Sequence, residues 1–260
     1  MNYIRSGLFN LLFFAWTAFM LAFLWLVMPF SPATFRRAIS LWPKGCFALL
    51  KIIGVSFEMR GLENLPGKPV VFAVKHQSVW ETIFFLWQHR DNAYIMKSEL
   101  ARIPFWGWYM TKSSHVLVDR TGGAKSMRDL IRKTKAIMDN SRSIAIFPEG
   151  TRMPSGTMGK FHPGVAAIYT QLNTTVVPVA VNSGLFWPRR KFLKNPGKIV
   201  IEFLAPIEPG MARKEFMTEL QSRIKMATLE LEKEAGFVAE EQSEKTIESA
   251  ESSEISGEAG

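Results

Sequence analysis

The sequence predicts an α/β fold: a single domain with a mostly buried central sheet flanked by helices, preceded by apolar N-terminal helices. The chain has 260 residues, which is enough for one domain with a well-buried core. Short β-branched and apolar runs alternate with longer stretches of helical periodicity, and this alternation is typical of an α/β domain. The expected strands cover residues 70–74, 93–96, 115–118, 143–147, 175–181 and 198–204. The expected helices cover residues 79–90, 123–140, 162–172 and 214–235.

The first element is an uncharged apolar run over residues 8–30, in which Asn10 and Thr17 are the only polar side chains. As a helix it would be about 35 Å long, which is enough to cross the hydrocarbon core of a bilayer. No small-x-small cleavage site follows it, so a retained anchor is favoured over a cleaved signal peptide. A second apolar stretch at 38–57 is interrupted by proline, glycine and lysine, which indicates a helix at the membrane interface. Residues 1–57 are therefore predicted to be the membrane-binding segment.

Positive charges flank the anchor, with Arg5 before it and Arg36, Arg37 and Lys44 after it. The heavier load lies on the C-terminal side, and the positive-inside rule places that side in the cytoplasm. We therefore expect the protein at the inner membrane, with its folded domain on the cytoplasmic face.

Charge is distributed unevenly along the chain. The formal net charge is +9, yet residues 231–260 contain nine Glu and only two Lys. The preceding body is therefore strongly basic, which indicates an anionic partner such as nucleic acid, anionic lipid or a phosphorylated substrate. Residues 236–260 are rich in Glu and Ser and are expected to be disordered, which leaves residues 58–235 as the folded domain. Cys46 is the only cysteine, so an intrachain disulfide is excluded.

A histidine and a glutamate lie where the expected strand 70–74 ends and the next helix begins. They are His76 and Glu81, in the segment KHQSVWET. The carboxyl edge of the sheet is where α/β folds commonly build their sites. If His76 lies in the turn, the first helical turn can bring the carboxylate to the imidazole and leave the other ring nitrogen to accept a proton from an alcohol. A histidine that only caps the helix or fills the sheet edge is the structural alternative.

A second group of polar residues follows the expected strand 143–147, in the segment FPEGTR. Arg152 is suited to bidentate recognition of a phosphate, and Gly150 lets the backbone approach a ligand closely. Glu149 can fix the loop or the arginine. Taken alone, the segment is explained equally well as an ordinary exit from a strand with a surface ion pair.

The segment HQSVWE, followed about seventy residues later by FPEGTR, resembles the glycerolipid acyltransferase family, and lysophosphatidic acid acyltransferases in particular. The resemblance covers about residues 60–205, and two spaced motifs are more specific than either alone. It implies that His76 is the catalytic base and that Glu81 orients it. The family has an aspartate at this second position, and glutamate keeps the charge while adding one methylene. The resemblance assigns the substrate phosphate to the loop formed by Glu149, Gly150, Thr151 and Arg152.

Weaker parts of the resemblance extend over one region that runs from residues 95–100 (IMKSEL) through 104–108 (PFWGW) to 118–120 (VDR), and over a second region, residues 177–183 (VPVAVNS). In the family, the first of these regions is tied to binding of the glycerol phosphate. This implies that Lys97 and Arg120 are further phosphate contacts.

The resemblance implies transfer of an acyl group to the sn-2 hydroxyl of 1-acylglycerol 3-phosphate, giving phosphatidic acid in phospholipid biosynthesis. The donor would be acyl-CoA or acyl-carrier protein, and transfer would be direct, without a covalent acyl-enzyme. No cofactor and no metal are expected. The expected partners are lysophosphatidic acid, the acyl donor and membrane lipid, with no nucleic acid.

Other readings of the sequence stay open. Relatives with this motif set use several acceptors, so lyso-ornithine lipid and glycerol 3-phosphate are alternatives. A non-catalytic membrane-surface protein that binds anionic lipid would explain the charge and the anchor, but it leaves the two spaced motifs as a coincidence. A serine hydrolase and a zinc protease of the HExxH type are disfavoured because the chain contains neither G-x-S-x-G nor H-E-x-x-H.

Overall fold

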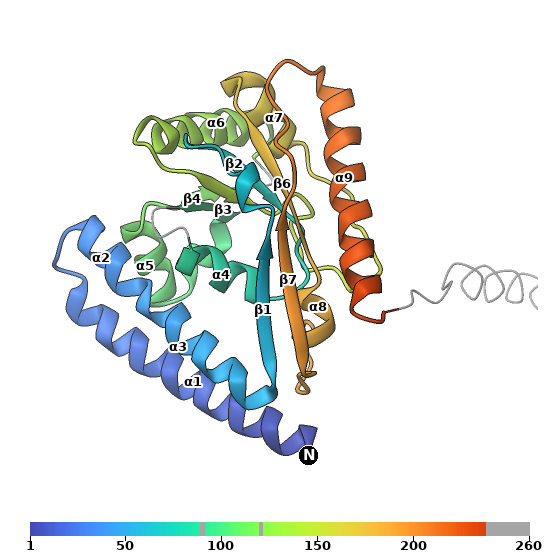
Figure 1. Cartoon of the computed structure of the whole chain (residues 1–260). Helices are drawn as coiled ribbons and strands as arrows, with labels where there is room; N and C mark the ends of the chain where they lie inside the picture. Colours follow the sequence, from blue (N-terminus) through green and yellow to red (C-terminus); the bar gives the residue numbers. More distant parts are fainter. Residues whose placement is uncertain (89–91, 120–121, 238–260) are drawn as a thin grey trace, which may run out of the picture.

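The computed structural model describes residues 1–88, 92–119 and 122–237 (Figure 1). Within these residues, seven strands form one sheet in the order β1-β7-β6-β2-β5-β3-β4. The strands are β1 Val55–Arg60, β2 Val71–Val74, β3 Ala93–Lys97, β4 Val116–Val118, β5 Ile144–Ile146, β6 Val176–Val181 and β7 Gly197–Phe203. The α-helices are α1 Asn2–Val27, α2 Pro32–Ile39, α3 Leu41–Leu50, α4 Trp80–Gln88, α5 Trp106–Lys112, α6 Gly123–Asp139, α7 Gly164–Leu172, α8 Ser183–Phe186 and α9 Arg213–Glu234.

The expected α/β fold is confirmed, with each expected strand matching one of β2 to β7 and each expected helix matching α4, α6, α7 or α9. The second apolar stretch differs from the expectation. It was expected to be helical up to residue 57, but the chain turns at Gly54, with φ of 68°, and continues as β1. Residues 55–57 therefore belong to the sheet, where β1 pairs in parallel with β7. Arg120 and nearly all of the acidic tail, residues 238–260, lie outside the described residues.

The direction of the strands decides where a site can form. β2 is parallel to both β5 and β6, and β3 is parallel to both β5 and β4. Only β7 and its partner β1 run the other way, because β7 is antiparallel to β6. The carboxyl ends of β2, β3, β5 and β6 therefore lie at one edge of the sheet, which is the edge where α/β folds bind ligands.

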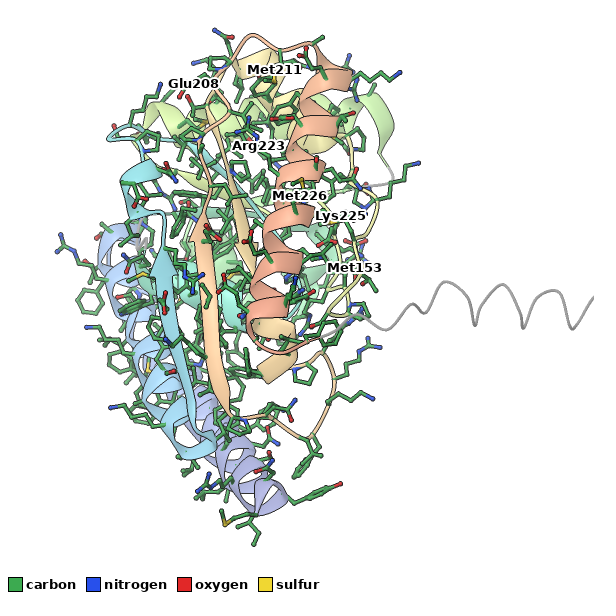
Figure 2. All side chains as sticks on the ribbon, turned by 45° about the vertical axis from the view of Figure 1, so that its right-hand side comes forward. Met153, Glu208, Met211, Arg223, Lys225 and Met226 are labelled. Atoms are coloured by element: carbon green, nitrogen blue, oxygen red, sulfur yellow. The ribbon has the colours of Figure 1, made fainter. Side chains whose placement is uncertain are left out.

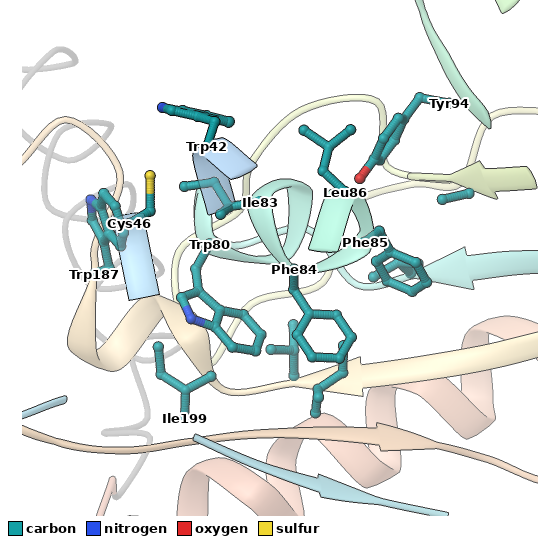
Figure 3. Close-up of a cluster of buried hydrophobic side chains, with 14 of the residues drawn as sticks. Trp42, Cys46, Trp80, Ile83, Phe84, Phe85, Leu86, Tyr94, Trp187 and Ile199 are labelled. Atoms are coloured by element: carbon teal, nitrogen blue, oxygen red, sulfur yellow. The ribbon is translucent and has the colours of Figure 1, made fainter. Parts of the chain in front are cut away.

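Both faces of the sheet are covered by apolar side chains. Phe72 and Val74 of β2 belong to a core shared with α1, α3 and α4, whereas Val71 and Ala73 point to a second core shared with α7 and α9. The first core is rich in aromatic rings, among them Trp42, Trp80, Phe84, Phe85 and Tyr94 (Figure 3). The long helix α9 covers the opposite side of the sheet (Figures 1 and 2).

Helix α1 is long and apolar enough to cross a membrane, and only 11% of its most apolar window is buried. It nevertheless contacts the domain along its length. Near its start, Ser6 Oγ accepts a hydrogen bond from the backbone N–H of Lys194 at 3.0 Å. Near its end, the carbonyl of Leu21 accepts one from the hydroxyl of Tyr109 in α5 at 2.6 Å. The helix therefore lies against the folded domain at both ends, while its outer face exposes large apolar side chains.

The contact between α1 and α3 depends on a glycine. A Cβ atom at Gly45 would overlap the indole ring of Trp16, whose Nε1 donates a hydrogen bond to the carbonyl of Trp42 at 2.9 Å. We predict that Gly45→Val lowers the free energy of unfolding by about 1–3 kcal/mol, the usual cost of overpacking, because the indole must move and this hydrogen bond breaks.

Thermal unfolding in detergent measures this effect. Gly67→Val is the matched control, because nothing lies within 4 Å of a Cβ atom at Gly67. Equal melting temperatures for the two variants would contradict a tight contact between α1 and α3.

Candidate active site

The turn between β2 and α4 holds His76 beside Glu81. His76 Nδ1 lies 2.9 Å from Glu81 Oε1, so the pairing expected from the sequence is present. Glu81 is completely buried in the first turn of α4, where the helix dipole favours a carboxylate. A carboxylate accepts the Nδ1 proton, and this leaves Nε2 of the ring as a proton acceptor.

The carboxylate of Glu81 is held by further donors. Its Oε1 also accepts the backbone N–H groups of Gln77 at 2.6 Å and Ser78 at 2.7 Å. Its Oε2 accepts the hydroxyl of Ser183, at the start of α8, at 2.7 Å. The imidazole of His76 stacks on the ring of Phe147, with a centroid separation of 4.1 Å. The orientation of the imidazole is thus fixed both at its Nδ1 atom and on one face.

Glu149 belongs to the loop that the resemblance assigns to the phosphate, and its contacts are those of a residue that fixes this loop, as its position in the sequence also allowed. Its side chain is buried, and Oε1 accepts hydrogen bonds from Lys75 Nζ at 2.6 Å and from the backbone of Gly159 at 2.8 Å. Its Oε2 accepts the backbone N–H of His76 at 3.1 Å. Its contacts join the loop after β5 to the turn that carries His76, and its charge is paired with that of Lys75.

Arg152 lies in the same loop and is half-buried. Burial is the largest influence on the pKa of Arg152 and lowers it. The Glu81 carboxylate acts to raise this pKa, and the charges of Arg189 and Arg190 act to lower it. Next in the chain, the N–H of Met153 donates to the carbonyl of His76 at 2.8 Å. The guanidinium of Arg152 therefore lies within electrostatic reach of the His76 and Glu81 pair.

The remaining expected residues occupy different positions at the same edge. Gly150 has φ of 65°, and its N–H closes a turn onto the carbonyl of Phe147 at 2.9 Å. Thr151 is exposed. Lys97 is exposed at the end of β3, which is the neighbour of β5. Arg120 lies outside the described residues, so its place in the site stays a prediction.

Sequence reasoning missed a connection from the C-terminal helix. Glu232 of α9 is buried; its Oε1 accepts from Gln77 Nε2 at 2.6 Å, and its Oε2 accepts from the N–H of Gly156 at 2.9 Å. Burial raises the pKa of Glu232. Gln77 in turn accepts the N–H of Gly184 at 3.1 Å. These contacts join α9, the loop after β5 and the residue next to His76.

An apolar cavity of about 470 Å³ opens beside these residues, between the sheet and helix α6. Most of its lining is apolar, and it includes Ile95, Met96, Met127, Leu130, Ile146 and Phe147. Phe147 borders the cavity and also stacks on His76, so the cavity begins close to the imidazole.

The buried pair of Lys75 and Glu149 gives a prediction about stability. Removing one partner leaves an uncompensated buried charge, so we predict that Glu149→Gln lowers the free energy of unfolding by about 3–5 kcal/mol. The double variant Lys75→Met, Glu149→Gln should lose less than the sum of the losses in Lys75→Met alone and Glu149→Gln alone, because it leaves no unpaired charge.

Denaturant unfolding of the four forms measures the coupling. The exposed pair of Lys135 and Asp139, with Nζ 2.8 Å from Oδ2, is the control and should couple by less than about 1 kcal/mol. Additive effects at Lys75 and Glu149 would contradict the role given to the buried pair.

Comparison with known proteins agrees with this geometry. The model of the family described as Acyltransferase matches residues 56–182. A 1-acyl-sn-glycerol-3-phosphate acyltransferase of Pseudomonas aeruginosa is 34% identical over 203 residues, covering 76% of this chain and 78% of the relative. A protein of the same name from Saccharomyces cerevisiae is 27% identical, covering 72% of this chain and 63% of the relative.

The fold is also that of a solved structure. The crystal structure of the 1-acyl-sn-glycerophosphate acyltransferase PlsC from Thermotoga maritima superposes with a TM-score of 0.73 at 23% identity, covering 89% of this chain and 98% of the other. Together, the family match and the bacterial relative show that the chain belongs to the acyltransferase family and is an O-acyltransferase.

Proposed function

We propose that the protein transfers an acyl group from a thioester donor, acyl-CoA or acyl-carrier protein, to the sn-2 hydroxyl of 1-acylglycerol 3-phosphate, giving phosphatidic acid. The observation that carries this proposal is the bond of 2.9 Å between His76 Nδ1 and the buried carboxylate of Glu81. The names of the relatives support the choice of acceptor.

In the proposed mechanism, Nε2 of His76 removes the proton from the acceptor hydroxyl as its oxygen attacks the thioester carbonyl. The Glu81 carboxylate stabilises the imidazolium that forms. When the tetrahedral intermediate collapses, the carbon–sulfur bond breaks and the imidazolium returns the proton to the thiolate that leaves. The products are the new ester and a free thiol, and His76 is neutral again. The reaction as proposed requires no cofactor and no metal.

Substrate positioning is proposed to come from charge and from the cavity. The charge of Glu81 acts on the Arg152 guanidinium and tends to raise its pKa. Arg152 is suited to holding the acceptor's phosphate near the reacting hydroxyl. Lys97 ends the strand next to β5 and is proposed as a second phosphate contact. The apolar cavity next to Phe147 is suited to an acyl chain.

The apolar N-terminal helix supports association with a membrane. We propose that the protein binds the cytoplasmic face of the inner membrane, where a lipid acceptor and a soluble donor meet. The exposed apolar face of α1 would enter the leaflet, and the contacts at Ser6 and Leu21 would hold the catalytic domain against it. The basic body favours an anionic leaflet.

We predict that His76→Ala loses a factor of about 10²–10⁴ or more in kcat, because no other group takes the proton. The measurement is thioester-dependent formation of phosphatidic acid by purified protein in detergent, with lyso-ornithine lipid as a competing acceptor. The melting temperature of the variant reports separately on folding.

Undiminished turnover in His76→Ala would contradict the base. If the parent protein acylated only the ornithine lipid, the choice of acceptor would be wrong, while the mechanism would stand.

We also predict that Glu81→Gln lowers kcat by about 10²–10⁴, because a neutral amide cannot stabilise the imidazolium. The KM for the acceptor should change little, because Glu81 is buried behind His76. Glu230→Gln, at an exposed position of α9, is the matched control and should behave like the parent. A Glu81→Gln variant with parental kcat would show that the carboxylate has no part in proton transfer.

A further inference from the structure

The loop between α8 and β7 carries three consecutive exposed cations, Arg189, Arg190 and Lys191. Residues 188–194 are called the basic loop below. No role is assigned to these charges by the mechanism above. The family match ends at residue 182, so the basic loop lies beyond it.

One end of the basic loop contacts the active site. Arg189 Nη1 donates a hydrogen bond to the carbonyl of Arg152 at 3.0 Å. Arg190 is held with φ of 57°, in the left-handed region that is uncommon for a residue with a side chain. Arg189 thus lies against the backbone of Arg152, Arg190 follows it directly in the chain, and the charges of both act on the Arg152 guanidinium.

The other end of the basic loop contacts the membrane helix. The carbonyl of Phe192 accepts a hydrogen bond from Asn10 Nδ2 at 3.2 Å, and the N–H of Lys194 donates to Ser6 Oγ. The side chain of Phe192 is 55% exposed, like the apolar side chains on the outer face of α1. The cations therefore lie where α1 meets the catalytic domain.

An anion bound between cations that lie close together would offset their repulsion. Among the residues that the structure describes, no carboxylate forms a salt bridge with Arg152, Arg189 or Arg190. Glu81, which acts on Arg152 electrostatically, is already bonded to His76, Gln77, Ser78 and Ser183. A phosphate monoester carries up to two charges at neutral pH and fits guanidinium groups, whereas a phosphodiester carries one and an ornithine headgroup has no phosphate.

We propose that Arg152, Arg189 and Arg190 form one binding site for the phosphate monoester of the acceptor lipid, and that the basic loop selects this acceptor over lyso-lipids that lack a monoester. The inference rests on the proposed function and names the residues that determine its specificity. Acyl-CoA also carries a phosphate monoester, and an anionic leaflet carries phosphates, so the experiment separates these three sources.

The test variant is Arg190→Asn, because asparagine tolerates the left-handed backbone and no hydrogen bond of the Arg190 side chain is lost among the described contacts. Arg213→Asn is the matched control. Arg213 is exposed at the first residue of α9, about 28 Å of helix away from Glu232. Both variants are assayed as the full chain in nonionic micelles, where the surface has no charge of its own.

We expect the KM for lysophosphatidic acid to rise about tenfold or more in Arg190→Asn, as for loss of one charge-assisted contact, with a much smaller change in kcat. The KM for acyl-CoA and the KM for lyso-ornithine lipid should not change. Arg213→Asn should match the parent throughout. An unchanged KM for lysophosphatidic acid overturns the proposal, and so does a rise in the KM for acyl-CoA alone. An effect seen on anionic vesicles but absent in nonionic micelles overturns it as well, in favour of the leaflet.

A binding measurement keeps the inference testable if the proposed function fails. Parent and Arg190→Asn protein are compared for binding to nonionic micelles that contain either lysophosphatidic acid or lysophosphatidylethanolamine, a phosphodiester. The parent should prefer the monoester, and the variant should lose most of this preference. If the parent fails to acylate lysophosphatidic acid yet shows the preference, the function is wrong and the site stands. If the parent shows no preference, the site is wrong.

Discussion

The site depends on the parallel pairing of β2 with β5, in which Val71 lies opposite Ile144. Because the two strands are neighbours and run the same way, they end at the same edge of the sheet. Two segments about seventy residues apart in the sequence therefore meet, and Glu149 can bond to both Lys75 and the backbone of His76. A slip of one residue in this register would turn the side chains to the other face and separate them. The buried ion pair thus fixes the register as well as the loop.

Local patterns predicted most of this architecture. The runs of apolar residues predicted strands β2 to β7 and four helices. The five-residue spacing predicted the pairing of His76 with Glu81, because a turn followed by the first turn of a helix brings the carboxylate to the imidazole. The sequence analysis did not predict strand β1, because the first residues of β1 continue the apolar stretch of α3. These residues are extended because they pair with β7, which is far away in the sequence. The role of Glu232 could not be predicted, because its partner Gln77 is 155 residues away and nothing local distinguishes this glutamate in an acidic segment.

Glu81 stands where the family has an aspartate, and its carboxylate contacts the His76 imidazole. Its carboxylate lies at the start of α4, where Oε1 accepts two backbone N–H groups as well as the hydrogen bond from His76. The other oxygen is held by Ser183 from a different strand end. Four donors around one buried carboxylate leave it little freedom, so the position of Oε1 relative to the imidazole is set by the backbone and hardly by side-chain length. The turn between β2 and α4 therefore accommodates a glutamate at the position where the family has an aspartate.

The basic loop connects the apolar helix α1 to the candidate active site. The basic loop contacts Ser6 and Asn10 of α1 at one end and Arg152 at the other, so in the proposed membrane-bound arrangement the depth of α1 in the leaflet would set the height of the proposed phosphate site. Moving a lyso-lipid with a chain of about sixteen carbons out of the bilayer into water would cost on the order of 10 kcal/mol, at about 0.8 kcal/mol for each CH₂ group. A phosphate site held at headgroup level, as proposed, would avoid this cost, because the chain could pass into the apolar cavity beside the histidine without entering water. Contact of α1 with the domain at both of its ends is what this arrangement requires, since a helix attached at one end only would leave the height of the site undetermined.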